Sequence, residues 1–199
     1  MSFWTWLRRV AIRPLAMFTM AGLIAACGQD APQFNGTDIT GTRLGRDFAL
    51  VDQNGKARDM ASFEGKVAVM FFGFTQCPDV CPAALAELAE VKKNLGKQGD
   101  SLDVVMITVD PARDTPEILK GYVEAFDPSF IGLTGSPEAV KKAAGSFKAY
   151  YAAVPQKDGA YSMDHTASFY VFDKKGEARV LAANNIGVAA LTKDIQALL

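Results

Sequence analysis

The sequence contains a single histidine, His165, and three cysteines, two of which, Cys77 and Cys81, lie close together. A structural zinc site usually has four ligands, most often cysteine and histidine side chains. This chain could complete such a site only by adding a carboxylate, for example that of Asp79 or Asp164. The scarcity of cysteine and histidine therefore disfavours a closed structural zinc site.

The sequence also lacks an excess of basic residues. Of the 21 basic residues, three (Arg8, Arg9 and Arg13) lie in the first 27 residues, which contain no acidic residue. The rest of the chain has 18 basic and 22 acidic residues, which gives it a net charge of about −4. This balance argues against a nucleic-acid partner and is compatible with a positively charged protein partner.

No apolar run is as long as the roughly 20 residues that a membrane-spanning helix needs. The run from Pro14 to Ala26 is shorter, follows the pair Arg8-Arg9, and ends just before Cys27. A basic start, a short apolar run and small residues before a break predict a secretory signal in residues 1–27. The cysteine after Ala25-Ala26 resembles the lipobox of bacterial lipoproteins, which implies cleavage before Cys27 and a lipid on its sulfur. The alternatives are an uncleaved membrane anchor and an ordinary export signal.

Residues 28–45 are rich in Gly, Asp, Thr and Asn and show no apolar period, so we expect a flexible tether there. Residues 46–199 then form one domain, since no fixed-period repeat occurs and 49% of the chain is hydrophobic. We expect a bacterial protein that is exported and anchored on the periplasmic face of the membrane. Export places the cysteine pair in an oxidising compartment.

The order of elements in this domain predicts an α/β fold with a central sheet flanked by helices. A strand near 48–51 and a turn at Asn54-Gly55 indicate an N-terminal β-hairpin. Thr115-Pro116 and Ser136-Pro137 are typical helix starts. We expect Ile118 on the inner face of the first of these helices and Tyr151 on the inner face of the second. We expect residues 152–164 to form a polar loop. The remaining predicted strands are 67–74, 102–109, 130–133, 167–172 and 178–182, and the remaining predicted helices are 83–95 and 188–199.

Cys77 and Cys81 are spaced C-x-x-x-C between the end of strand 67–74 and the following helix. Pro82 suits the first helical position, which would make Cys81 the N-cap and lower the pKa of its thiol. The two cysteines are near enough in sequence to form a disulfide in an oxidised form. The alternatives are a buried structural pair and a permanent disulfide.

His165 comes just before strand 167–172, which we expect to lie beside strand 67–74. The preceding loop would then bring the imidazole to the sheet end that carries Cys77 and Cys81. Two thiolates and one imidazole suit Cu(I), and Cu(II) accepts them with an added oxygen ligand. The alternative is a histidine with no ligand role. Met163 is more typical of packing than of a thioether ligand.

Asp110, Arg113 and Asp114 follow the strand 102–109. By themselves they indicate a solvated turn or an ion pair within one loop, which would contribute little stability.

Three separated motifs together resemble the Sco/SenC family of copper proteins. They are F-G-F-T-Q-C-P-D-V-C-P at 72–82, V-D-P-A-R-D-T-P at 109–116 and D-H-T at 164–166. The resemblance implies a thioredoxin-like fold, copper bound by Cys77, Cys81 and His165, and an anchor outside the cytoplasmic membrane. It also implies a role in assembling the dinuclear copper centre of cytochrome c oxidase.

Two functions of different classes follow from these residues. The first is a copper metallochaperone that passes copper to the copper-bearing subunit of the oxidase. The second is a thiol-disulfide reductase in which Cys77 and Cys81 are catalytic and keep the oxidase cysteines reduced. Other copper chaperones or thiol reductants are further candidate partners. Two features differ from thioredoxins: the cysteine spacing is not C-x-x-C, and His165-Thr166 stands where thioredoxins carry a proline. Both favour copper handling over general disulfide exchange. A peroxide-reactive cysteine is a third alternative.

Overall fold

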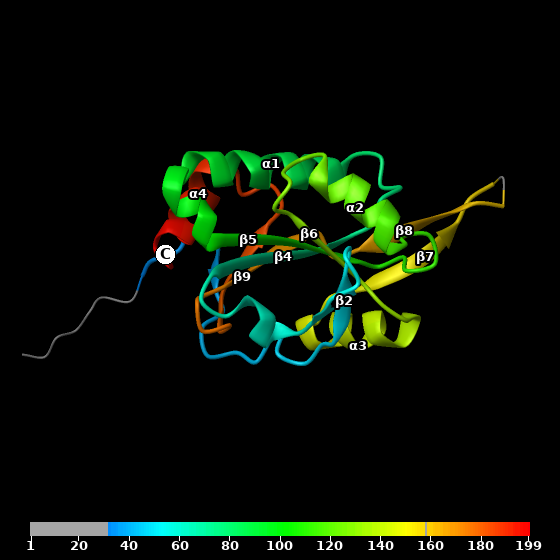
Figure 1. The fold of residues 1–199 in the computed structure, drawn as a ribbon, viewed down its shortest axis with the longest axis horizontal. Coiled ribbons are helices and arrows are strands. Elements are labelled where there is room, and N and C mark those ends of the chain that lie inside the picture. Colours follow the sequence, from blue (N-terminus) through cyan, green and yellow to red (C-terminus); the bar gives the residue numbers. More distant parts are fainter. Residues whose placement is uncertain (1–31, 158) are drawn as a thin grey trace, which may run out of the picture. The chain divides into compact units, whose positions relative to one another are not determined.

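An eight-stranded mixed sheet forms the centre of the structure, a computed structural model that describes residues 32–157 and 159–199 (Figure 1). The strand order is β1-β10-β9-β4-β5-β6-β2-β3. The pairs β4–β5 and β5–β6 are parallel, and the other pairs of this sheet are antiparallel. The strands are β1 (Thr37–Asp38), β2 (Leu50–Asp52), β3 (Ala57–Arg58), β4 (Val67–Gly73), β5 (Leu102–Thr108), β6 (Ile131–Thr134), β9 (Ser168–Phe172) and β10 (Ala178–Ala183).

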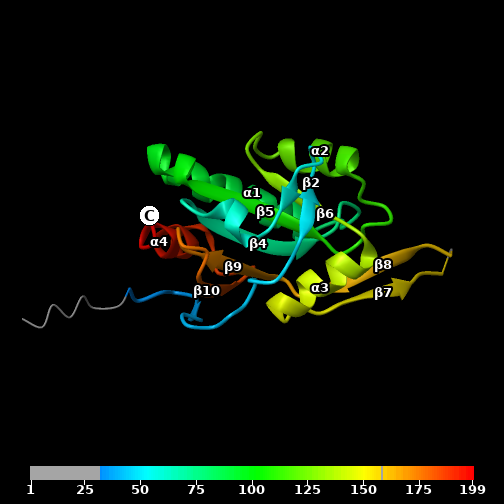
Figure 2. The same ribbon diagram turned by 60° about the horizontal axis from the view of Figure 1, so that its bottom comes forward.

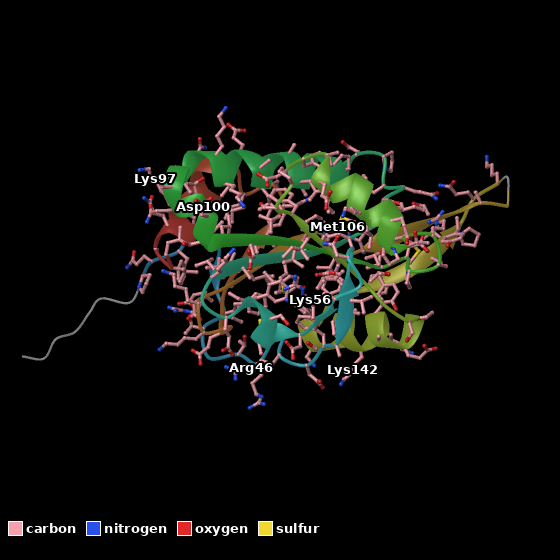
Figure 3. The ribbon with its side chains drawn as sticks, viewed as in Figure 1. Arg46, Lys56, Lys97, Asp100, Met106 and Lys142 are labelled. Atoms are coloured by element: carbon pink, nitrogen blue, oxygen red, sulfur yellow. The ribbon has the colours of Figure 1, made fainter. Side chains whose placement is uncertain are left out.

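Helices cover both faces of this sheet (Figures 1 and 2). The helices α1, α2 and α4 lie on one face, and α3 lies on the other. Charged side chains such as Lys97 and Lys142 point outward, whereas Met106 of β5 lies among the packed elements (Figure 3). The helices are α1 (Val80–Asn94), α2 (Pro116–Glu124), α3 (Pro137–Phe147) and α4 (Val188–Gln196), with short 3₁₀ helices at Met60–Phe63 and Gly96–Ser101. The predicted α/β fold with a central mixed sheet is confirmed.

Several of the sequence signals that start and position these elements act as expected. All seven residues of β4 are buried, which explains its nearly continuous apolar run. Thr115 and Ser136 cap α2 and α3, and their side chains accept hydrogen bonds from the amides of Ile118 and Ala139. The predicted N-terminal hairpin is present as β2 and β3, which pair across Asn54-Gly55.

Three local predictions are wrong. The stretch 152–164, expected to be a polar loop, belongs largely to the antiparallel strands β7 (Tyr151–Pro155) and β8 (Tyr161–His165). Tyr151 therefore starts a strand and does not continue α3. Ile118 was expected on the inner face of α2 but is 49% exposed. The buried residues of that helix are Leu119 and Val123.

Part of the expected tether is held against the domain. The described portion of 28–45 includes β1, which pairs with β10. Just before it, the carboxylate of Asp194 on α4 accepts hydrogen bonds from the amides of Asn35 and Gly36. No helix among the described residues is long and apolar enough to cross a bilayer. The expected signal segment 1–27 and its Cys27 lie outside the described residues.

Candidate metal centre

The loop after β4 carries Cys77 and leads directly into α1. The helix begins at Val80, three residues earlier than the sequence predicted, and Asp79 is its N-cap residue. Cys81 consequently lies inside the first helical turn and is not the N-cap. Pro82 is accommodated because the first four amides of a helix have no partner within the helix.

The first turn of α1 places the two thiols in different environments. The amide of Cys81 points back along the loop and donates a hydrogen bond to Sγ of Cys77, with an N···S distance of 3.4 Å. Cys81 is only 1% exposed, whereas Cys77 is partly exposed. Burial raises the pKa of the Cys81 thiol, so the expected lowering of that pKa is wrong. Desolvation outweighs the hydrogen bond from the backbone of Phe74, which by itself would lower this pKa.

Gly73, the last residue of β4, makes room for the buried thiol. A Cβ atom at this position would lie 3.0 Å from Sγ of Cys81 and 3.3 Å from the ring of Phe71. Carbon atoms rarely approach a neighbour so closely without displacing it. A glycine between the strand and the loop therefore allows Cys81 to pack against the backbone of β4.

His165 is the last residue of β8 and reaches the same corner from the other side. Its Nδ1 lies 3.1 Å from the carbonyl oxygen of Thr166. A carbonyl only accepts hydrogen bonds, so Nδ1 carries the proton and Nε2 keeps a free lone pair. Nε2 lies 3.7 Å from Sγ of Cys81, and the imidazole packs edge-on against Phe74. The imidazole is thus oriented to bind a metal through Nε2.

The structure brings the three predicted ligands together. Their ligand atoms, the sulfurs of Cys77 and Cys81 and a ring nitrogen of His165, all lie within 4.8 Å of one another. Ligand atoms about 2.0–2.3 Å from a shared metal lie roughly 3.5–4 Å apart, so small movements would allow all three to bind one ion. Neither Asp79 nor Asp164 belongs to this group, which is the one found among the described residues. Two sulfurs and one imidazole form a soft donor set that fits copper.

Two of the three residues, Cys77 and His165, line an open cleft of about 250 Å³. Apolar side chains form much of the wall, including Phe74, Val80 and Met163. Met163 is also part of the buried core, as expected of a packing residue. Both cysteines are free thiols in this structure. Cys77 and His165 are therefore reached from solvent through this cleft, whereas Cys81 is buried and does not line it.

A buried carboxylate supports the cysteine loop, and sequence reasoning missed it. Asp114 is 0% exposed. It accepts hydrogen bonds from the amide of Thr75 (3.1 Å), from the hydroxyl of Thr75 (2.6 Å) and from the hydroxyl of Thr108 (2.5 Å). These bonds fasten the loop to the end of β5. The prediction of a solvated turn at 110–114 is wrong, and Asp110, which is 4% exposed, is buried as well. The alternative prediction, an ion pair within this loop, is confirmed by the contact between Asp110 and Arg113.

Comparisons with known proteins show which family the chain resembles. The SCO1/SenC family model matches residues 36–199. A SCO2-like protein of Rickettsia felis is 40% identical over 137 residues, which are 68% of this chain and 67% of that protein. The solved structure of Bradyrhizobium japonicum ScoI with copper bound is 42% identical, has a TM-score of 0.73, and covers 78% of this chain and 99% of its own. Yeast Sco1 with copper bound is 34% identical, with a TM-score of 0.72 and coverage of 78% and 87%.

Proposed function

Since the chain belongs to the SCO1/SenC family, we propose that it binds copper and delivers it to the dinuclear copper site of cytochrome c oxidase during assembly of that enzyme. The observation that carries the proposal is the convergence of Cys77, Cys81 and His165, two of which, Cys77 and His165, line an open cleft. Two related proteins hold copper in their solved structures. The motifs that resemble the family imply the oxidase as the destination.

Copper is cargo in this proposal, and each ligand has a separate role. Cys81 is buried and holds the ion on the side away from solvent, with its thiol proton released on binding. Cys77 is partly exposed, and its sulfur accepts a hydrogen bond from the amide of Cys81. His165 presents Nε2 to the same ion. Ligands of a receiving protein would replace Cys77 and His165 first, because these two are reached from the cleft.

A copper titration of the purified, reduced protein tests the binding step. We expect one copper ion per chain and a weaker complex for His165→Ala and for Cys77→Ser. Tyr150→Ala is a matched control, because Tyr150 is 64% exposed and lies outside the group of ligands. Equal affinity of His165→Ala and the unchanged protein would contradict a three-ligand site.

A transfer experiment tests the destination. Copper-loaded protein is mixed with the metal-free, reduced copper-bearing subunit of the oxidase, and the spectrum of the dinuclear centre is recorded. We expect that spectrum to appear with the unchanged protein and to be much reduced with Cys77→Ser. Tight copper binding with no transfer to the subunit would indicate storage of copper and would contradict delivery.

The unequal exposure of the two thiols favours a second candidate function, thiol-disulfide reduction. Cys77 would attack a disulfide of the oxidase subunit, and Cys81 would then displace the reduced subunit and form the Cys77–Cys81 disulfide. One disulfide is reduced and one is formed, so the electrons balance. Turnover that survives both His165→Ala and complete removal of metal would support this function over copper delivery.

We also propose that the protein is bacterial, exported and anchored to the membrane through a lipid on Cys27. The support is the sequence of residues 1–27 and the bacterial relatives among the comparisons. In cells fed a radioactive or clickable fatty acid, we expect label on the unchanged protein and none on Cys27→Ser. Unlabelled protein that still sediments with membranes would indicate an uncleaved anchor.

A further inference from the structure

Arg113 lies between the two chain segments that supply the ligands. Its Nη1 atom donates to Oε1 of Gln76, the residue before Cys77, at 2.9 Å. The same atom donates to the carbonyl oxygen of Tyr161, the first residue of the strand that ends at His165, also at 2.9 Å. One guanidinium nitrogen therefore connects the cysteine loop with the histidine hairpin.

Two further contacts hold Arg113 in this position. Its guanidinium lies over the ring of Tyr161, 3.7 Å from the ring centre. Nε pairs with the carboxylate of Asp110, which also accepts a hydrogen bond of 2.9 Å from the hydroxyl of Tyr161. Asp110 is nearly fully buried, so this ion pair is shielded from solvent. We call Asp110, Arg113 and Tyr161 the clamp.

The clamp is important because the hairpin is a separate sheet. The strands β7 and β8 pair only with each other among the described residues, and the hairpin extends beyond the main sheet (Figures 1 and 2). An isolated two-stranded hairpin is marginally stable in water, so side-chain contacts must orient it. Met163 packs the middle of β8 into the core. The clamp holds the start of the same strand.

Alternation along β8 relates the clamp directly to the ligand. Tyr161, Met163 and His165 occupy alternate positions of one strand, so their side chains lie on the same face. This face meets the cysteine loop, because Arg113 contacts Tyr161 at one end and Cys81 contacts His165 at the other. The angle of the hairpin thus determines how far Nε2 lies from the two sulfurs.

We propose that Arg113 is a positioning residue, which through the clamp keeps the imidazole of His165 within bonding reach of Cys77 and Cys81. The proposal deepens the copper function and rests on it for its metal-dependent part. Without Arg113, the two thiols still bind a soft ion, but the imidazole leaves the site for much of the time. Loss of a group that hydrogen-bonds directly to a metal ligand lowers metal affinity by about 10- to 100-fold. Arg113 acts one contact further away, so we expect a loss toward the lower end of that range.

Hydrogen exchange of the full-length, metal-free protein tests the proposal without copper. For Arg113→Ala we expect exchange at the amides of β8 to become at least about tenfold faster, while β4 and β5 keep their protection. Arg58→Ala is the matched control. Arg58 also pairs with a buried aspartate, Asp52, and lies near an aromatic ring, but it belongs to β3 at the edge of the sheet. We expect Arg58→Ala to leave the hydrogen-exchange rates of the β8 amides unchanged.

The copper complex supplies a second readout, the magnetic coupling of imidazole nitrogen to Cu(II) in pulsed electron paramagnetic resonance. We expect this signal to weaken in Arg113→Ala and to be retained in Arg58→Ala. Tyr161→Phe keeps the ring and loses only the hydroxyl bond to Asp110. Its imidazole signal should therefore lie between those of Arg113→Ala and Arg58→Ala.

Unchanged β8 exchange together with an unchanged imidazole signal in folded Arg113→Ala would overturn the proposal. If Arg113→Ala does not fold, Tyr161→Leu is judged by the same two criteria, since it removes the stacked ring and leaves the arginine paired. If the unchanged protein binds no copper, the proposed function fails, and hydrogen exchange alone still decides whether the clamp orients the hairpin.

Discussion

His165 and Cys81 are separated by 84 positions in the chain, yet Nε2 of one lies 3.7 Å from Sγ of the other. The contact exists because β9, which follows the hairpin, is antiparallel to β4 and begins at the sheet end where β4 stops. The hairpin then returns His165 to the first turn of α1. This contact brings a buried thiol and an oriented imidazole together at one corner of the sheet.

The two cysteines should differ strongly in their reaction with an alkylating reagent. We expect Cys77 to be modified first and Cys81 much more slowly in the reduced, metal-free protein, because Cys81 is 1% exposed and burial raises its pKa. Peptide mapping by mass spectrometry after short exposure to iodoacetamide measures both rates and separates them from Cys27. Equal rates in the folded protein would contradict the described environment of Cys81.

Gly73→Ala should disturb the metal site more than the fold. The added methyl group would lie 3.0 Å from Sγ of Cys81, so the sulfur has to move by a few tenths of an ångström. The backbone of Gly73 does not need a positive φ, so we expect a loss of at most about 1–3 kcal/mol in unfolding free energy, together with weaker copper binding. Chemical denaturation and copper titration measure the two effects.

Gly145→Ala is the control for that substitution. No atom lies within 4 Å of a Cβ placed at Gly145, which is in α3. We expect unchanged copper affinity and a small gain in stability, about 0.5–1 kcal/mol, from the better helix propensity of alanine. A loss of copper affinity in both variants would indicate that the effect of Gly73→Ala is not local.

Asp114→Ala should destabilise the metal-free protein. The substitution leaves the amide of Thr75 and two threonine hydroxyls without their acceptor in a buried place, which costs about 2–4 kcal/mol. Asp103→Ala is the control, because it removes only a pair with the exposed amine of Lys66 and should change stability by about 0–1 kcal/mol. Urea denaturation measures both. Similar losses would show that Asp114 is not a central support.

The stabilising effect of Asp52 should disappear in acid. Burial alone would raise the pKa of Asp52, but hydrogen bonds from the amides of Lys56 and Asn54 and from Arg58 lower it. Since the folded pKa is below the ordinary value of 3.8, the contribution is present above that pH and is lost as pH falls through the folded pKa. Asp52→Asn should therefore be less stable than the unchanged protein at pH 7, by about 1–3 kcal/mol.

The difference between the two proteins should shrink toward pH 2, and denaturation at several pH values measures it. Asp47→Asn is the control, because Asp47 is exposed and pairs with an exposed lysine. Its effect should be small at every pH. A stability difference for Asp52→Asn that does not depend on pH would mean that the folded pKa of this carboxyl is not lowered.

Most of the fold was predictable because local signals agree with the tertiary structure. The apolar run of β4 and the Thr115-Pro116 and Ser136-Pro137 caps are examples in which the sequence alone suffices. The hairpin β7–β8 was missed, since its residues are mixed in polarity and the contacts that orient it come from Arg113, far away in sequence. Contacts between residues so far apart in the sequence leave no periodic pattern in it.

The site shows the same division. The spacing of Cys77 and Cys81 and the rarity of histidine identified the three side chains that the structure brings together. The pKa of Cys81 could not be anticipated, because it depends on how deeply the thiol is buried against β4, where Gly73 leaves room for it. The buried state of Asp110 and Asp114 depends likewise on the packing of β5 against the cysteine loop.

X-ray absorption at the copper edge of the Cu(I)-loaded protein tests the central claim most directly, because it counts the atoms bound to the ion. We predict two sulfur neighbours and one imidazole nitrogen per copper, with the outer-shell imidazole scattering lost in His165→Ala. Two sulfurs and no imidazole, or a shell of oxygen and nitrogen only, would contradict the account.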